Sequence, residues 1–178
     1  MQKIAEKLLK NFVLNLKKSE MDSIKKDKIL KKKILKNAAQ RSENLYRRLN
    51  RLQRSLENYW ETHLADRFIE GVSCGILLGL ETRGALKGKG FIPLKKGEAE
   101  MHGEFWQSVE QMLAENRYDR ERSGFDRSCT KEEQEIAEQL YICTSDIFCV
   151  KEEYYWDEGM RIGILFGSNA ATMLQNCL

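Results

Sequence analysis

The sequence predicts an all-α protein: a helical bundle of two pseudo-symmetric helical hairpins with glycine-striped helices, plus a basic N-terminal helical arm. Three observations lead to this prediction. The first glycine of the 178-residue chain is Gly71 and its only proline is Pro93, so a long N-terminal stretch holds no helix breaker. Apolar residues recur at helical spacing through that stretch. The motif E-G-x-x-x-G-I-L-x-G occurs at 70–79 and returns 88 positions later, at 158–167.

Residues 1–42 are expected to form the arm, as one or two amphipathic helices. Apolar residues of the first helix recur mostly four positions apart between Ile4 and Leu16, and those of the second lie between Ile24 and Ala38. The next apolar residues follow the 4, 3, 4, 3 spacing of a heptad: Leu45, Leu49, Leu52, Leu56 and Tyr59. The sequence leaves open whether residues 22–60 form one helix or break near 37–42.

We expect residues 43–84 to form helical repeat 1 and residues 131–178 to form helical repeat 2, each a leucine-type helix followed by a glycine-striped helix. The connector, residues 85–130, is predicted to be a loop, a helix ending near Asn116, and a charged loop over 117–128. Thr130 and Glu133 have the spacing of a capping box at the start of repeat 2. Residues 43–178 are expected to form one compact body.

The glycines of the repeated motif lie on one side of each predicted helix. Each glycine costs about 1 kcal/mol relative to alanine inside a helix, so some close contact has to offset it. We predict that the two glycine faces pack directly on each other. The alternatives are that they accommodate bulky neighbours such as Trp60, or that they line a ligand groove. The predicted helix-packing residues are Gly71, Gly75, Gly79, Gly159, Gly163 and Gly167.

Glu70 and Glu158 are the acidic residues that the two copies of the motif share. One interpretation is a cap or an ion pair, for example with Arg67 or Arg161. The other is a pair of carboxylates used in catalysis or metal binding. The sequence leaves both interpretations open.

The charge of the chain is uneven, although its net charge is only +3. Residues 1–54 hold 17 Lys and Arg against 5 Asp and Glu, whereas residues 55–178 hold 13 against 22. Such a basic segment is typical of contact with an anion, which is nucleic acid, an acidic protein surface or the acidic C-terminal half of the same chain. Its plainest alternative is a solvated lysine-rich helix. The predicted nucleic-acid or partner-binding residues are Lys25, Lys26, Lys31, Lys32, Lys33, Arg47, Arg48, Arg51, Arg54, Lys87 and Lys89.

Motifs that would indicate an enzyme are missing from the sequence. It has two histidines, no C-x-x-C pair among five cysteines, and an 84–89 segment too short by one residue for a phosphate loop. We therefore predict no catalytic activity, no cofactor and no metal. The first residues lack the apolar core of a signal peptide and no apolar stretch is long enough to span a bilayer, so a cytoplasmic location with free thiols and no membrane partner is expected.

The two motif copies at 70–79 and 158–167 resemble the helices of small proteins from clostridial bacteria and their phages, a resemblance that implies no activity. In size, helical character and uneven charge the chain is also similar to phage-encoded anti-CRISPR inhibitors. That resemblance implies binding to a Cas nuclease or its guide-RNA complex. The expected function is a non-enzymatic protein that engages nucleic acid or a nucleoprotein complex through its Lys/Arg-rich helical arm, as an inhibitor of a CRISPR-type nuclease. The alternative is a structural protein in which the heptads at 45–59 and the exposed apolar arm make a homodimer with no nucleic-acid role.

Overall fold

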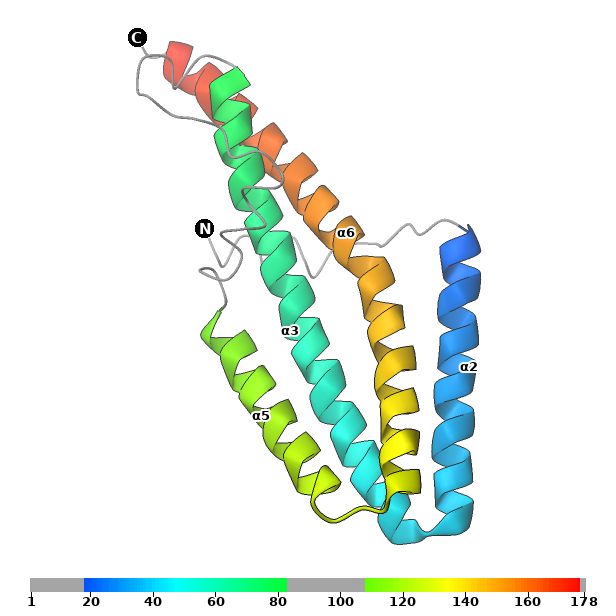
Figure 1. The fold of residues 1–178 in the computed structure, drawn as a ribbon. Coiled ribbons are helices and arrows are strands. Elements are labelled where there is room, and N and C mark those ends of the chain that lie inside the picture. Colours follow the sequence, from blue (N-terminus) through cyan, green and yellow to red (C-terminus); the bar gives the residue numbers. More distant parts are fainter. Residues whose placement is uncertain (1–17, 83–107, 177–178) are drawn as a thin grey trace. The chain divides into compact units, whose positions relative to one another are not determined.

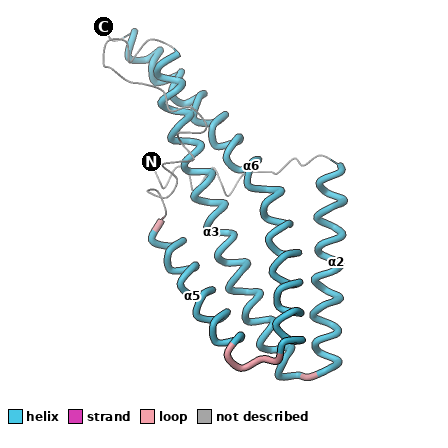
Figure 2. Tube along the Cα trace, in the orientation of Figure 1, coloured by secondary structure: helices cyan, strands magenta, loops and turns pink. Residues whose placement is uncertain are grey.

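Four helices make up the part of the chain that the computed structural model describes, residues 18–82 and 108–176 (Figure 1). They are α2 (Lys18–Arg41), α3 (Glu43–Thr82), α5 (Val109–Asp126) and α6 (Lys131–Asn176). Within these ranges no strand is present and loops are confined to short connections, as Figure 2 shows. The prediction of an all-α bundle is confirmed. The helix predicted between Ile4 and Leu16 lies outside the described residues.

The helices form two compact units, and α3 and α6 take part in both. The glycine-pair unit contains α3 from Leu64 onward and α6 from Glu152 onward. The four-helix unit contains α2, α3 up to His63, α5, and α6 up to Lys151. This division differs from the expected arm, repeats and connector at 1–42, 43–84, 85–130 and 131–178. The described part of the expected arm, α2, packs inside the four-helix unit and does not stand apart from it.

Burial explains why α2 belongs to the four-helix unit. Ile34 and Ala38 of α2 lie in the same buried cluster as Leu140 of α6. That cluster closes one continuous core in which each helix of the unit contributes apolar side chains. Its members are Ile34, Ala38, Leu45, Leu49, Leu52, Phe125, Ala137, Leu140 and Cys143.

The leucines with heptad spacing point into this core. Leu45, Leu49, Leu52 and Leu56 are each exposed by 4% or less. They are covered by residues of the same chain, so they offer no surface to a second copy. The use of these leucines as a dimer surface is therefore wrong, while the rest of the homodimer alternative stays a prediction.

Ser42 separates α2 from α3, so residues 22–60 do not form one continuous helix. Its backbone N–H donates to the carbonyl of Ala38 at 3.0 Å, which closes the last turn of α2. The carbonyl oxygen of Ser42 accepts a hydrogen bond from the backbone N–H of Tyr46 at 3.0 Å. Its hydroxyl oxygen accepts one from the backbone N–H of Leu45 at 3.4 Å. Ser42 thus ends one helix and caps the next, as serine commonly does.

Two predicted helix boundaries are wrong. First, α3 and α6 run without a break through the leucine-type and glycine-striped segments, which were expected to be separate helices. Second, the predicted charged loop at 117–128 is helical as far as Asp126. The extra turns of α5 are stabilised because Phe125 is buried and Tyr118 packs against the core.

The predicted capping box is confirmed. The backbone N–H of Thr130 donates to Glu133 Oε2 at 2.9 Å, and the backbone N–H of Glu133 donates to Thr130 Oγ1 at 3.3 Å. Because α6 begins 88 positions after α3, Thr130 is the counterpart of Ser42. The duplication therefore extends from the repeated glycine motif back to the residues that cap α3 and α6.

In the glycine-pair unit α3 and α6 run parallel, with the two backbones in direct contact (Figure 1). A Cβ added to Gly71 would overlap the carbonyl oxygen of Trp156, and one added to Gly159 would overlap that of Phe68. These two contacts are related by the same shift of 88 positions. The predicted packing of the glycine faces on each other is confirmed, and the pair is pseudo-twofold symmetric.

Candidate nucleic-acid interface

Apart from Lys31, the lysines of α2 lie on the side of the helix that faces away from the core. Ile24, Ile34 and Ala38 mark the buried side. Because one turn takes 3.6 residues, positions half a turn away from these residues face outward. The exposed lysines of this outer side are Lys18, Lys25, Lys26, Lys28, Lys32, Lys33 and Lys36.

The outer side of α3 carries arginines. Arg47, Arg51 and Arg54 are spaced four and three residues apart and are all exposed. They alternate with the buried leucines of the same helix, so packing of the core holds the guanidinium groups in solvent. Arg47 Nε lies 2.9 Å from Glu43 Oε1, an exposed pair that contributes little to stability.

Lys31 and Arg48, two residues of the predicted set, are engaged inside the protein. Lys31 Nζ lies 2.5 Å from Glu57 Oε1, and the lysine side chain is only 16% exposed. Arg48 donates to the carbonyl oxygens of Phe125 at 3.2 Å and Ser128 at 3.4 Å. Its guanidinium also lies 4.9 Å from the centre of the Phe125 ring. These contacts give Lys31 and Arg48 a structural role.

The remaining cations differ in how strongly they are held. Lys25 Nζ is 3.4 Å from Asp22 Oδ1, with both side chains exposed. Lys87 and Lys89 lie outside the described residues. Within the described ranges, the following cations form no ion pair: Lys26, Lys32, Lys33, Lys36, Arg51 and Arg54.

The two hairpins of the four-helix unit carry opposite charge. Residues 18–63 hold 13 Lys and Arg against 6 Asp and Glu, whereas residues 108–151 hold 6 against 10. The shift of 88 positions pairs Arg47 of α3 with Glu135 of α6. Since the same fold accepts glutamate at the equivalent position, the fold itself does not require the cation of α3.

The two motif glutamates form local ion pairs. Arg67 Nη1 lies 2.6 Å from Glu70 Oε2, and Arg67 Nε lies 3.1 Å from Glu152 Oε1, at an angle that makes no hydrogen bond. Arg161 donates twice to Glu158, at 2.8 and 2.5 Å, and this hydrogen bonding lowers the pKa of that carboxyl. The ion-pair interpretation therefore holds for both. Among the described residues no group of acidic, histidine and cysteine side chains is arranged to hold a metal ion.

Three of the described thiols, those of Cys74, Cys129 and Cys143, are poor nucleophiles. Burial raises the pKa of Cys74, where the carboxylate of Glu70 adds to the effect. Burial likewise raises the pKa of Cys143 and of Cys129. Because the thiolate is the reactive form, these groups stay protonated and unreactive near neutral pH.

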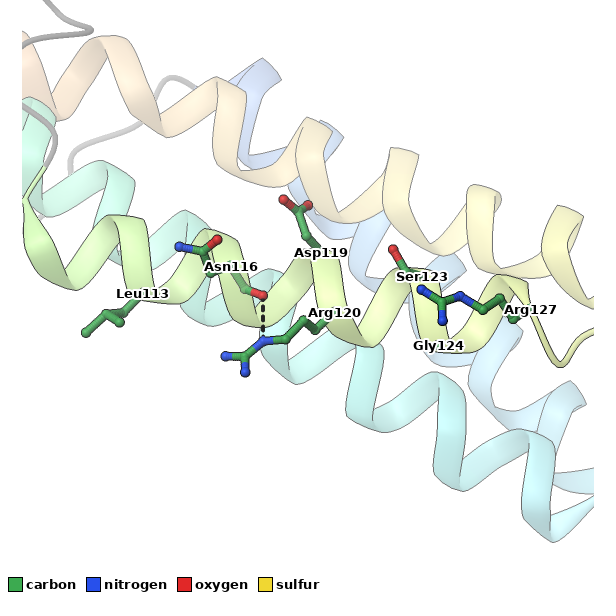
Figure 3. Close-up of a pocket in the computed structure, with 7 residues that line it drawn as sticks. All are labelled: Leu113, Asn116, Asp119, Arg120, Ser123, Gly124 and Arg127. Atoms are coloured by element: carbon green, nitrogen blue, oxygen red, sulfur yellow. Dashed lines mark hydrogen bonds between the residues drawn. The ribbon is translucent and has the colours of Figure 1, made fainter.

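One surface hollow is lined by α5 and the residue that follows it, as Figure 3 shows. Its residues are Leu113, Asn116, Asp119, Arg120, Ser123, Gly124 and Arg127. All are exposed, and Arg120 Nε donates to the carbonyl of Asn116 at 3.1 Å. Because one helix and its C-cap residue supply the lining, no second helix forms an opposing wall, in contrast to ordinary small-molecule sites.

No protein-family model, curated protein or solved structure matches this chain. No helix in the described ranges is long and apolar enough to cross a membrane. The exposed cations of α2 and α3 are therefore the feature from which a function can be argued.

The sequence did not single out Lys151, a half-buried residue of α6. Its Nζ lies 4.7 Å from the centre of the Phe148 ring, in the geometry of a cation–π contact. Burial, followed by repulsion from Lys28, lowers the pKa of Lys151. One feature of the sequence could have drawn attention to Lys151: it is the only basic residue between Glu132 and Glu158.

Proposed function

We propose that this protein is a non-enzymatic nucleic-acid-binding module that contacts the phosphate backbone through its basic hairpin α2–α3. One observation carries the proposal. The cations of α3 stand exposed where α6, which folds in the same way, carries acidic or neutral residues at the equivalent positions, such as Glu135 for Arg47 and Gln139 for Arg51. Selection for folding alone does not account for that difference.

The residue types suit contact with phosphates and not with bases. Lysine and arginine neutralise phosphates and release condensed counterions, which gives binding a strong salt dependence. Lys25, Lys32 and Lys36 follow one another along the outer side of α2 over about 16 Å, at about 1.5 Å of rise per residue. No aromatic side chain lies in α2, so base stacking from this helix is not part of the proposal.

A finer proposal concerns the kind of nucleic acid. The resemblance in size and charge to anti-CRISPR inhibitors suggests that the target is a nucleoprotein complex, a Cas nuclease with its guide RNA. In that case the basic hairpin contacts the nucleic acid while the acidic hairpin α5–α6 meets a basic protein surface. This arrangement requires the two opposite charges to act on one target.

The test measures binding to a fluorescent DNA duplex of roughly 20 base pairs and to an RNA of similar length, from about 50 to about 200 mM salt. Neutralising about six phosphates gives a log–log salt slope of about −5 on duplex DNA. The variant carrying Lys32→Glu, Lys33→Glu, Arg51→Glu and Arg54→Glu should bind far more weakly. Its slope should be nearer to about −2, because each phosphate that is no longer neutralised reduces the slope by about 0.9.

The matched control reverses four exposed cations of the other hairpin: Arg117→Glu, Arg120→Glu, Arg127→Glu and Lys131→Glu. Affinity and slope should both fall much less in this control. Equal losses in the two variants would show that net charge, and not the α2–α3 surface, drives binding. Binding of both variants with the wild-type slope would exclude the proposed surface. A pull-down with and without nuclease treatment then separates a nucleoprotein target from free nucleic acid.

A further inference from the structure

Three large apolar side chains of α6 are exposed in the glycine-pair unit. Leu165 is 54% exposed, Phe166 48% and Met173 71%. Among the residues described in this unit, no other large apolar side chain is exposed to this degree. The half-buried Ile162 and the exposed Asn169 lie on the same side of the helix. We call these five residues the uncharged face.

The spacing of the uncharged face is that of a seam between two helices. Ile162, Phe166, Asn169 and Met173 follow one another at intervals of 4, 3 and 4, as the a and d positions of a coiled coil do. The motif glycines of α6 are buried against α3, so α3 covers a different side of α6. In the four-helix unit α2 and α5 pack on α3 and α6, whereas the described part of the glycine-pair unit holds no further helix.

The absence of charge indicates which partner fits this face. Residues 162–178 hold no Asp, Glu, Lys or Arg, although 32% of the whole chain is charged. The fold does not require this absence, because Glu81 of α3 occupies the position equivalent to Asn169. The uncharged face has no group that neutralises phosphates or pairs with a charged protein surface. In a twofold dimer each surface meets a copy of itself, so a face without charge avoids repulsion by its own copy.

Asn169 determines how two copies of the face fit together. Its amide group both donates and accepts hydrogen bonds, so two Asn169 side chains that face each other satisfy one another. This happens when the two helices run parallel and in register, and a single asparagine at such a position favours parallel dimers. In an antiparallel pair Asn169 would lie opposite Phe166, and its amide would be left without a partner.

We propose that the uncharged face is a homodimer interface, in which the α6 helices of two copies lie parallel with Asn169 facing its counterpart in the second copy. This surface is distinct from the buried leucines at 45–59. It extends about 16 Å along α6, at about 1.5 Å of rise per residue. Since stable dimers bury larger surfaces, the dissociation constant should lie above about 1 μM. The inference does not depend on nucleic-acid binding.

The first test is sedimentation equilibrium of the full-length chain without nucleic acid, from about 1 to about 500 μM. The wild-type mass should rise from 20.8 kDa toward twice that value. Phe166→Glu should weaken dimerisation at least about thirtyfold, because residues at the centre of an interface contribute most of its affinity. The matched control is Ile142→Glu, which should dimerise like the wild type. Ile142 is 50% exposed on the same helix but lies in the four-helix unit.

Two results of the first test would overturn the inference. One is a wild-type chain that stays monomeric at every concentration. Binding of that monomer to phosphatidylcholine vesicles, lost in Phe166→Glu, would then assign the face to a lipid surface. The other is a Phe166→Glu chain that dimerises as strongly as the wild type.

The second test uses Asn169, whose exposed side chain can be replaced without disturbing the core. Asn169→Asp and Asn169→Lys should each be monomeric at concentrations where the wild type is a dimer, because like charges would meet across the twofold axis. An equimolar mixture of the two variants should recover the dimer, because opposite charges then face each other. Circular dichroism checks that both variants are folded. A mixture of folded variants that stays monomeric would overturn the parallel interface.

Discussion

Gly75 of α3 and Gly163 of α6 face each other so closely that a Cβ built on either would lie 2.9 Å from the Cα of the other. The neighbours in the way are backbone atoms, which cannot turn aside as the end of a flexible side chain does. The six motif glycines cost about 1 kcal/mol each in helix propensity, and close packing of two backbones along α3 and α6 offsets that cost.

The first prediction is that Gly163→Ala destabilises the protein strongly. The added methyl group would overlap the carbonyl oxygen of Val72 and crowd the N–H of Ile76 at 2.8 Å, so the helices must separate. The gain in helix propensity is about 1 kcal/mol, and we expect overpacking to outweigh it, for a net loss of about 2 kcal/mol or more. Urea unfolding followed by circular dichroism measures the change.

Gly124→Ala is the matched control for this prediction. Gly124 lies within α5, and a Cβ added there meets no atom within 4 Å. The same chemical change should therefore stabilise the protein by about 0.5–1 kcal/mol. If the free energy of unfolding changes in the same direction in both variants, close backbone approach is not the reason for the glycines of α3 and α6.

The glycine pairing could be predicted from sequence because the signal is local and occurs twice. Three glycines on one side of a helix demand compensation, and an identical second face in the same chain offers it. The position of α2 could not be predicted in the same way. The spacing of Ile24, Ile34 and Ala38 shows that one side is apolar, but it does not show whether that side is buried against distant residues such as Leu140.

The positive charge of the candidate site could be predicted from the sequence. Which of its cations bind other residues of the same protein could not. A count of lysines and arginines locates the basic hairpin. It does not distinguish Lys32, which stays in solvent, from Lys31, whose partner Glu57 is 26 positions away. Arg48 is similar, because its acceptors lie about 80 positions further along the chain. Contacts between distant residues decide which cations remain exposed.

The second prediction separates a structural arginine from an exposed one. Arg48→Met removes charge-assisted hydrogen bonds to the carbonyls of Phe125 and Ser128 at the turn between α5 and α6. We expect a loss of about 2 kcal/mol in the free energy of unfolding, with the salt slope of nucleic-acid binding unchanged. Arg51→Met should show the reverse, with stability kept within about 0.5 kcal/mol and the slope reduced by about 1. Matching behaviour of the two variants would refute this assignment of roles.

The third prediction concerns acid stability through the capping box. Hydrogen bonding from the backbone N–H of Thr130 lowers the pKa of Glu133 below its ordinary value of 4.5. Its contribution to stability is therefore present above about pH 4.5 and is lost as the pH falls through the lower, folded-state pKa. Thr130→Ala should cost about 1 kcal/mol near neutral pH.

Glu133→Gln tests the charged part of that contribution. Glutamine keeps a group able to accept from the N–H of Thr130 but cannot be protonated in this range. The variant should lose less stability than the wild type between about pH 5 and about pH 3, as measured by urea unfolding at each pH. An identical acid loss in the two proteins would place the titrating groups elsewhere, for example at Glu158.

The last prediction concerns alkaline pH and the tyrosine stack of the four-helix unit. Tyr118 lies between Tyr59 and Tyr141, with ring centres 6.4 and 6.3 Å away. Burial raises its pKa from 10 to about 12, although Arg122 acts in the opposite direction. The unfolded chain therefore releases this proton at a lower pH than the folded protein does. The stability that Tyr118 contributes is complete below about pH 10 and is lost as the pH rises toward 12.

Tyr118→Phe should lose less stability over this range, measured by urea unfolding, and its phenolate absorbance should lack a step near pH 12. Tyr141→Phe is the control, since it preserves the buried hydroxyl and should keep that step. A wild-type alkaline loss in Tyr118→Phe would show that the Tyr118 hydroxyl does not limit stability at high pH.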